Sequence, residues 1–229
     1  MLGLSLMTLT IDITTDPMEL FTYWHNQAAG YFRGGSFKDQ IFFPFRKLIR
    51  FLYPPFMIYG GNAMVLATST LDGRPSARVV LYKGIWQGGV LFYTNYHSRK
   101  SHELEKNPHG SLVFHWALPE RQVRFEGKVK KVPHKLSDTY WASRQRGSQE
   151  GAWASKQSEK VASRGELIER VEKIKTRFKG KPIPRPSHWG GYVLHPECIE
   201  FWEACAFRLH KRRIYQKQGS GWQSTLLCP

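Results

Sequence analysis

The stretch from residue 78 to residue 100 constrains the fold of this chain more than any other part of the sequence. Two runs of β-branched and aromatic residues lie on either side of a glycine-rich turn, and this pattern predicts two strands. Ser98 then predicts the start of a helix that has Arg99 and Lys100 in its first turn. Cations at that end oppose the helix dipole, so we expect an anion to bind there.

A hairpin followed by a surface helix with solvated cations has the same sequence pattern. Two further cations, Arg78 and Lys83, come from the preceding strand and favour the anion site. The guanidinium group and the ammonium group both suit a dianionic phosphate. The sequence therefore predicts a phosphate site between the end of one strand and the start of one helix.

The remaining sequence alternates short apolar runs with turns that contain glycine or proline. This pattern favours an antiparallel barrel or sandwich over a parallel sheet. Capping patterns predict a helix from Asp16 that ends at Gly30, a helix over 133–145, and a helix from Ser163 that ends at Gly180. The predicted strands are 63–70, 76–83, 89–95, 110–118, 121–132, 192–203 and 207–216, and a short helix is predicted over 97–107.

The formal net charge is +16, which suits nucleic acid, an anionic membrane surface or anionic small molecules. No helix-turn-helix, zinc-finger or RNA-binding motif accompanies that charge, and the cations are scattered along the chain. The nine histidines are dispersed, and we expect no metal site. The G-x-G-x-x-G, G-x-x-x-x-G-K-[ST] and H-E-x-x-H motifs are also missing, and although a Ser/His/Asp hydrolase stays open, no pattern favours one. A set of cations suited to a phosphorylated cofactor is left.

The three cysteines, Cys198, Cys205 and Cys228, lack metal-ligand spacing and fit a reducing compartment. The N-terminus lacks the basic segment of a signal peptide, and no uncharged run approaches the roughly 20 residues that span a bilayer. We therefore expect a cytoplasmic protein without a membrane span.

Residues 31–61 combine ten aromatic residues of the Tyr and Phe types with interleaved arginines and lysine. Such a segment can lie on a membrane or stack on nucleic-acid bases, or it can pack on a barrel or on a partner subunit. We favour packing. The predicted division of the chain is a helix with this insertion over 1–61, followed by a single domain over 62–229.

Eight motifs between about Asn62 and Pro229 resemble, in order, those of the pyridoxine/pyridoxamine 5′-phosphate oxidase family. The resemblance implies a mainly β fold with flanking helices, an antiparallel FMN-binding split β-barrel, and a homodimer. The motifs are Arg78 to Lys83, Tyr93-Thr94, Ser98-Arg99-Lys100, Arg121-Gln122-Val123, Gly151 to Ser158, Pro186 to Gly191, Ile199 to Trp202, and Arg208-Leu209-His210.

The resemblance also implies FMN as the cofactor. It places one group of residues around the phosphate and ribityl chain, and a second group around the rest of the flavin. The first group is Arg78, Lys83, Ser98, Arg99 and Lys100, and the second is Tyr93, Thr94, Gln122, Gln157, Ser158, Trp202 and Arg212.

The implied substrates are pyridoxine 5′-phosphate and pyridoxamine 5′-phosphate, which O2 would oxidise to pyridoxal 5′-phosphate with release of H2O2. Arg208 and His210 would face the pyridine ring as the catalytic pair, because they alternate on the predicted strand 207–216. The substrate phosphate would meet Lys83, Tyr140, Arg144 and Ser148. Tyr140 and Arg144 are four residues apart on a predicted helix and would share a face.

Three features depart from the family pattern. Lys211 follows Arg-Leu-His where Asp is usual, and the chain ends Leu226-Leu227-Cys228-Pro229 where the family has Arg-Leu-x-Pro. The family's N-terminal Arg-x-x-Tyr is missing, because the first fifteen residues contain neither Arg nor Tyr. We hypothesise that residues 31–61 replace that segment as a lid over the substrate.

Two other functions stay open. The first is a different reduced substrate for an FMN oxidoreductase of the same barrel. The second is a non-enzymatic basic module that binds nucleic acid or membrane through residues 31–61.

Overall fold

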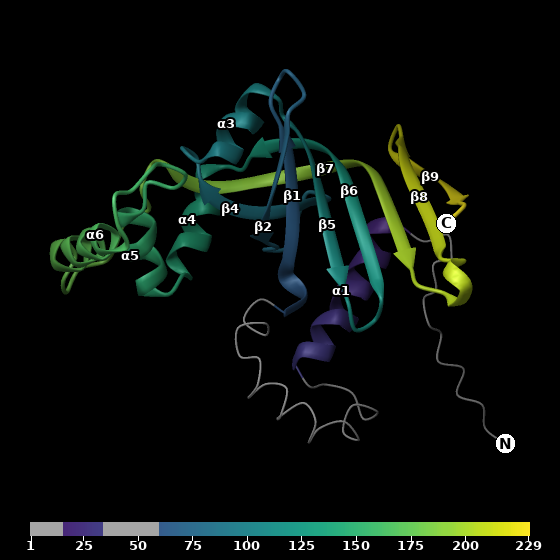
Figure 1. Cartoon of the computed structure of the whole chain (residues 1–229), viewed down its shortest axis with the longest axis horizontal. Coiled ribbons are helices and arrows are strands. Elements are labelled where there is room, and N and C mark those ends of the chain that lie inside the picture. Colours follow the sequence, from purple (N-terminus) through teal and green to yellow (C-terminus); the bar gives the residue numbers. More distant parts are fainter. Residues whose placement is uncertain (1–15, 34–59) are drawn as a thin grey trace. The chain divides into compact units, whose positions relative to one another are not determined.

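The computed structural model describes residues 16–33 and 60–229, and Figure 1 shows their helices and strands. The predicted insertion over 31–61 and its proposed lid therefore fall almost entirely outside the described residues. The helices are α1 (Pro17–Arg33), η3 (Gly60–Asn62), α3 (Arg99–Lys106), α4 (His134–Ala142), α5 (Arg146–Ala154), α6 (Arg164–Arg177) and η4 (Ala206–Arg208). The strands are β1 (Ala63–Ser69), β2 (Pro75–Leu81), β3 (Ile85–Trp86), β4 (Gly89–Asn95), β5 (His109–Trp116), β6 (Arg121–Lys131), β7 (Trp189–Glu203), β8 (Lys211–Gln218) and β9 (Gly221–Leu227).

The strands follow the order β2-β1-β5-β6-β7-β4-β3, and β8 pairs with β7 and β9. The registers of β3 with β4, β4 with β7, β7 with β8, and β8 with β9 are all antiparallel. This confirms the antiparallel sheet expected from short strands joined by tight turns.

The chain divides into two compact units. Among the described residues, the first comprises 16–33, 60–66, 111–127 and 196–229, and the second comprises 67–110 and 128–195. Both units therefore take segments from the single domain predicted over 62–229. The predicted boundary after residue 61 stays a prediction, since much of 1–61 lies outside the described residues.

In the first unit, α1 buries an apolar stripe that includes Phe21 and Trp24. The Phe21 ring lies 4.9 Å from that of Phe125, and the Trp24 ring lies 5.2 Å from that of Phe201. Asp16 caps the helix as predicted, because its carboxylate accepts the Met18 amide at 2.7 Å. The predicted end at Gly30 is wrong, since α1 continues to Arg33. A glycine costs only about 1 kcal/mol inside a helix, which packing of the buried stripe offsets.

In the second unit, β4 and β7 approach closely at two glycines. A Cβ at Gly190 would lie 2.1 Å from the hydroxyl of Tyr96, and one at Gly191 would lie 2.7 Å from the ring of Tyr93. Only glycine leaves room for both tyrosines. The Tyr96 hydroxyl donates to the Gly191 carbonyl at 3.2 Å, which fixes the tyrosine over the strand pair.

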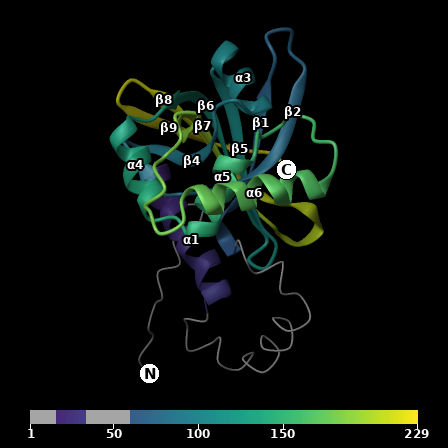
Figure 2. The same cartoon turned by 90° about the vertical axis from the view of Figure 1, so that its left-hand side faces the viewer.

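In the second unit, α4, α5 and α6 pack around a small apolar cluster of Trp141, Phe178, Ile183 and Trp189. Figure 2 shows α5 and α6 side by side. The predicted helix over 133–145 is too long: α4 ends at Ala142, and a separate helix, α5, begins at Arg146. The Ser163 cap of α6 is confirmed, because its hydroxyl accepts the Glu166 amide at 3.1 Å.

Within the described part of the chain, no helix is long and apolar enough to cross a membrane. The three cysteines are free thiols.

Candidate functional site

The first turn of α3 forms a buried polar cluster in the second unit. Ser98 occupies the N-cap position as predicted, but its side chain does not cap the helix. Instead, its hydroxyl accepts a hydrogen bond from the ammonium group of Lys100 at 3.1 Å, and the Thr94 hydroxyl accepts another from the same group at 3.0 Å. The Lys100 side chain thus turns inward from the helix to β4.

Lys100 is only 6% exposed, which is rare for a lysine without a carboxylate in direct contact. Burial, followed by the positive charge of Arg78, lowers the pKa of its ammonium group to about 8, although the negative charge of Glu103 acts in the opposite direction. A buried cation next to two hydroxyl groups is a natural partner for an anion.

Glu103 is the carboxylate of this cluster, and its side chain is 5% exposed. Its Oε2 atom accepts hydrogen bonds from the hydroxyls of Thr68 and Ser76 at 2.5 and 2.6 Å, and Oε1 accepts Nε of Arg99 at 2.8 Å. Burial alone would raise the pKa of Glu103, but these hydrogen bonds together with that from Arg78 lower it to about 2. Glu103 is therefore ionised at neutral pH.

The two arginines of the cluster differ in how firmly they are held. Arg78 of β2 donates to Thr68, Ser76 and Glu103, and its side chain is 21% exposed. Arg99 contacts Glu103, but its side chain is 64% exposed. Arg78 therefore forms part of the frame, whereas Arg99 is able to turn toward a ligand.

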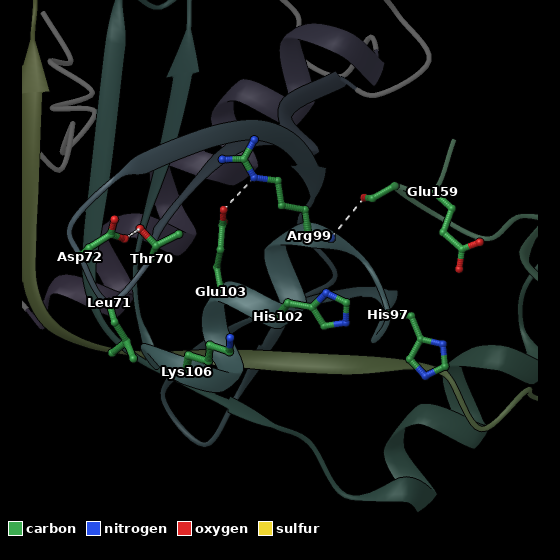
Figure 3. Close-up of a pocket in the computed structure, with 10 residues that line it drawn as sticks. Thr70, Leu71, Asp72, His97, Arg99, His102, Glu103, Lys106 and Glu159 are labelled. Carbon is green, nitrogen blue, oxygen red and sulfur yellow. Dashed lines mark hydrogen bonds and ion pairs between the residues drawn. The ribbon is translucent and has the colours of Figure 1, made fainter. Parts of the chain in front are cut away.

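A pocket of about 780 Å³ opens over the outer face of α3. Figure 3 shows Arg99, His102, Glu103 and Lys106 projecting from this helix, with Arg99 and Glu103 turned toward each other. The lining residues are Thr70, Leu71, Asp72, His97, Arg99, His102, Glu103, Lys106, Ser158 and Glu159. Arg99 and Ser158 are the predicted cofactor residues among them.

Gln157 and Ser158 reach the cluster from the segment after α5. The side-chain oxygen of Gln157 accepts the Thr94 hydroxyl at 3.2 Å and the Asn95 amide at 3.3 Å. The Ser158 hydroxyl accepts the first amide of α3, that of Arg99, at 3.2 Å. The backbone of Ser158 has a φ of 74°, a value that is rare for a residue other than glycine. Residues more than fifty positions apart in sequence are thus brought together.

A second cluster in this unit contains the residues predicted to meet the substrate phosphate. The rings of Tyr140 and Tyr93 are stacked at 4.1 Å, and the ring of Trp189 lies 5.5 Å from that of Tyr93. The ammonium group of Lys83 lies 5.5 Å from the centre of the Tyr140 ring, and the guanidinium carbon of Arg144 lies 4.5 Å from that of Trp189.

Arg144 follows the end of α4, so the predicted shared helical face with Tyr140 is not the reason for their proximity. Both side chains lie against Trp189 instead. Arg144 donates to the carbonyl oxygen of Ser148 at 2.8 Å, its Nε atom is buried without a hydrogen-bond partner, and burial lowers the pKa of its guanidinium group. An unpaired buried donor is costly, and a ligand oxygen would satisfy it.

The remaining predicted residues lie in the first unit. Trp202 and Arg212 are paired across β7 and β8. Arg212 donates from Nε to Glu200 at 2.8 Å, Arg124 donates to the other oxygen of Glu200 at 2.7 Å, and Glu200 is only 3% exposed. The contact explains how Arg212 is held although Lys211 stands beside it in place of the usual Asp. Gln122 is half-buried on β6.

The predicted strand over 207–216 begins too early, because β8 starts at Lys211. Phe207 and Arg208 have φ values of 57° and 62°, which no strand accommodates. The alternation argument for Arg208 and His210 is therefore wrong. His210 accepts the Cys205 amide at 3.2 Å and lies 4.7 Å from the Trp202 ring, whereas Arg208 is exposed.

Comparison with known proteins identifies the family. Residues 57–178, more than half of the chain, match the family described as "Pyridoxamine 5′-phosphate oxidase". The chain belongs to the pyridoxamine 5′-phosphate oxidase family. Residues 189–229 match the region described as "Pyridoxine 5′-phosphate oxidase C-terminal dimerisation region".

Relatives named pyridoxine/pyridoxamine 5′-phosphate oxidase cover most of this family member. The protein from Rubrobacter xylanophilus is 54% identical over 172 residues, which span 75% of this chain and 79% of the relative. The protein from Myxococcus xanthus strain DK1622 is 48% identical over 168 residues, which span 73% of this chain and 82% of the relative. These matches confirm the resemblance seen in the sequence and support an oxidase of the pyridoxamine 5′-phosphate oxidase family.

Two solved structures support the predicted split-barrel fold of the family. PhzG from Burkholderia lata, in complex with tetrahydrophenazine-1-carboxylic acid, is 32% identical with a TM-score of 0.70, covering 81% of this chain and 92% of PhzG. A pyridoxamine 5′-phosphate oxidase-related, FMN binding protein from Nostoc punctiforme has a TM-score of 0.62 at 16% identity, covering 81% and 98%.

Sequence reasoning about this family member missed several residues that contact the predicted site residues. Glu103 contacts two predicted phosphate residues, Trp189 supports Arg144, and Glu200 holds Arg212. Trp189 and Glu200 lie within two of the motifs that carry the resemblance, and Glu103 lies four residues after Arg99 on a predicted helix. That spacing is also common on exposed helix faces, so it did not indicate a buried carboxylate.

Proposed function

We propose that this chain is an FMN-dependent oxidase that converts pyridoxine 5′-phosphate or pyridoxamine 5′-phosphate to pyridoxal 5′-phosphate, with O2 as acceptor and H2O2 as a product. Oxidation of the amine also consumes one water molecule and releases ammonia. The carrying observation is the buried Lys100 at the start of α3, which Thr94 and Ser98 hold in place. In a family whose relatives bear this activity in their names, that cluster suits the phosphate of the flavin.

The donors present fit such a cofactor. The cations Arg99 and Lys100 and the hydroxyl of Ser158 supply charge and hydrogen bonds for a phosphate, and Arg78 stiffens the cluster from β2. Bound FMN would supply the acceptor for the two electrons removed from the substrate. For Lys83, Gln122, Trp202 and Arg212, assignment to the cofactor rests on the resemblance and stays a prediction.

The second cluster suits the substrate. Lys83, Tyr140 and Arg144 would bind its phosphate, with the unpaired Nε atom of Arg144 as one donor. Ser148 contributes its carbonyl to Arg144 and orients the guanidinium group. We retain Arg208 and His210 as the residues nearest the reacting carbon, an assignment that rests on the resemblance.

The deciding experiment is an oxidase assay with both vitamers. The purified chain, loaded with FMN, should show a flavin absorption spectrum, consume O2 and release H2O2 and pyridoxal 5′-phosphate in equal amounts. Pyridoxine without its phosphate is the control and should turn over far more slowly, because the contacts of Arg144 are lost. Absence of both flavin and turnover would contradict the proposal.

A different substrate is the second candidate, and one observation favours it. The structure of PhzG, which contains a tetrahydrophenazine carboxylic acid, resembles this chain with a TM-score of 0.70. A reduced tricyclic acid lacks a phosphate, so Arg144→Ala would leave its oxidation largely unchanged. Turnover of such a compound, without turnover of either vitamer, would favour this alternative.

We further propose a homodimer, because the C-terminal 41 residues over 189–229 match a dimerisation region. The cytoplasm remains the predicted compartment. The non-enzymatic module that binds nucleic acid or membrane also remains a prediction, because it rests on residues 31–61. Sedimentation of the purified protein tests whether it is a homodimer.

A further inference from the structure

Glu103 is an acidic residue in a place that is otherwise built for an anion. Its carboxylate is buried, and it accepts hydrogen bonds from Thr68, Ser76, Arg78 and Arg99. A buried carboxylate repels a neighbouring phosphate, so its presence weakens the site unless it performs another task.

The charges of the cluster indicate that task. Arg78, Arg99 and Lys100 carry three positive charges, and Glu103 leaves two uncompensated. A phosphate monoester carries between one and a half and two negative charges at neutral pH, according to its usual second pKa of about 6. The charge of the cluster and that of a monoester therefore match.

Two other carboxylates line the pocket, and each has its own cation. Asp72 contacts Arg74 at 3.0 Å, and Glu159 contacts Lys156 at 3.7 Å. Neither contributes to the hydrogen bonds of the α3 cluster that the structure describes. Glu103 is thus the carboxylate in direct contact with its arginines.

Glu103 affects its two arginines differently, because they differ in how many other acceptors hold them. Arg78 donates hydrogen bonds to three acceptors, so we expect it to keep its contact with Glu103 when a ligand binds. Arg99 is largely exposed, and among the described residues its guanidinium group pairs with one carboxylate oxygen, Oε1 of Glu103, at 2.8 Å. A ligand that recruits Arg99 must compete with this carboxylate.

We propose that Glu103 sets the charge of the cluster, and with it the preference for a phosphate monoester over more highly charged anions, by fixing Arg78 and by competing with the ligand for Arg99. The inference rests on the proposed function, because the phosphate in question is that of FMN. Glu103 acts through the arginines and is a positioning residue.

The test compares two inorganic anions on the full-length protein after removal of FMN. Dissociation constants for phosphate and pyrophosphate are measured by calorimetry at neutral pH and fixed ionic strength. Glu103→Gln keeps the shape of the side chain and adds one net positive charge to the cluster. Glu105→Gln is the matched control, because Glu105 lies on the same helix, is 63% exposed and pairs with Lys131.

In Glu103→Gln, the ratio of pyrophosphate affinity to phosphate affinity should rise about tenfold, as one added site charge meets roughly one added ligand charge across several ångströms. Glu105→Gln should keep the wild-type ratio. A ratio in Glu103→Gln that stays within twofold of the control overturns the inference. Glu103→Asp retains the charge and should retain the ratio; if it shifts as the glutamine variant does, geometry rather than charge is responsible.

Arg99→Gln provides an independent arm if Glu103→Gln does not fold. Removal of one exposed cation should lower the same ratio about tenfold. An unchanged ratio, or an apoprotein that binds neither anion, overturns the inference. Because the probes require neither FMN nor turnover, a shifted ratio in a protein without oxidase activity would contradict the proposed function alone.

Discussion

The start of α3 and the segment before β8 both carry residues that the proposed reaction needs, the first for the cofactor and the second for the substrate, yet they are built differently. At α3 the side chain of Lys100 is buried and donates hydrogen bonds to Thr94 and Ser98, and the buried carboxylate of Glu103 accepts a hydrogen bond from Thr68. Before β8, the backbone takes left-handed φ values at Phe207 and Arg208, and their side chains are exposed. The first site is fixed by its own chain, whereas the second is open to whatever binds beside it.

This contrast indicates where binding and turnover are expected to separate. A buried network resists motion, because each partner lost leaves an unsatisfied group. An exposed loop has few contacts to hold a side chain in place. We therefore expect changes at α3 to affect cofactor affinity, and changes before β8 to affect turnover.

The largest effect is expected for Arg208→Ala combined with His210→Ala. Loss of two charge-assisted or polar contacts to substrate should reduce kcat/KM by roughly a thousandfold, while the FMN content stays at the wild-type level. Flavin content and steady-state kinetics measure the two quantities. Loss of FMN with normal turnover per bound flavin would break the comparison.

Lys100→Met tests the buried side of the comparison. Removal of the ammonium group takes away a charge-assisted contact, and FMN should bind about a hundredfold more weakly. The exposed Lys130→Met is the control for net charge and should change the affinity by less than threefold. Fluorescence titration of the apoprotein gives both constants, and equal values for the two variants would contradict the assignment.

Glu200→Gln sharpens the comparison inside the first unit, where it loosens the contact to Arg212. Arg124 also contacts this side chain and keeps it in place. The substitution should therefore release Arg212 only partly. We expect FMN affinity to fall about tenfold. Arg124→Met keeps the contact between Glu200 and Arg212, and so it should have a smaller effect in the same titration.

The smallest effect is a pH dependence of stability. The pKa of Lys100 is about 8 in the folded chain and about 10.5 in an unfolded one, so the unfolded chain binds more protons between these values. The contribution of Lys100 to the free energy of unfolding should therefore rise as the pH increases from 8 to 10.5. Urea titrations of the apoprotein at several pH values should show a flatter profile for Lys100→Met, and parallel profiles would contradict the lowered pKa.

Short-range patterns predicted much of the fold. Asp16 and Ser163 cap helices where the sequence placed them, and Ser98 precedes α3. Gly30 did not end α1, because the sequence does not show how much apolar surface a helix buries. The strand predicted from Phe207 was wrong for a related reason: β-branched and aromatic residues indicate strands, but not the turn that precedes them.

The candidate site divides in the same way. Arg99, Lys100 and Thr94 were predicted by motif, and the structure brings them together. The carboxylate of Glu103 was not predicted, because its burial depends on Thr68 and Ser76 of two distant strands. Motifs indicate which residues bind a charge, but not which residues compensate it.

Four strands, β1, β5, β6 and β7, have residues in both compact units, and β7 is the longest of them. Its residues 189–194 pair with β4, and its residues 198–203 pair with β8. The amide protons of each half should therefore exchange with solvent only when their own unit opens. One shared exchange rate along β7 would mean that the two units melt as one cooperative body, and two rates would mean that the chain holds two foldons joined by a continuous backbone.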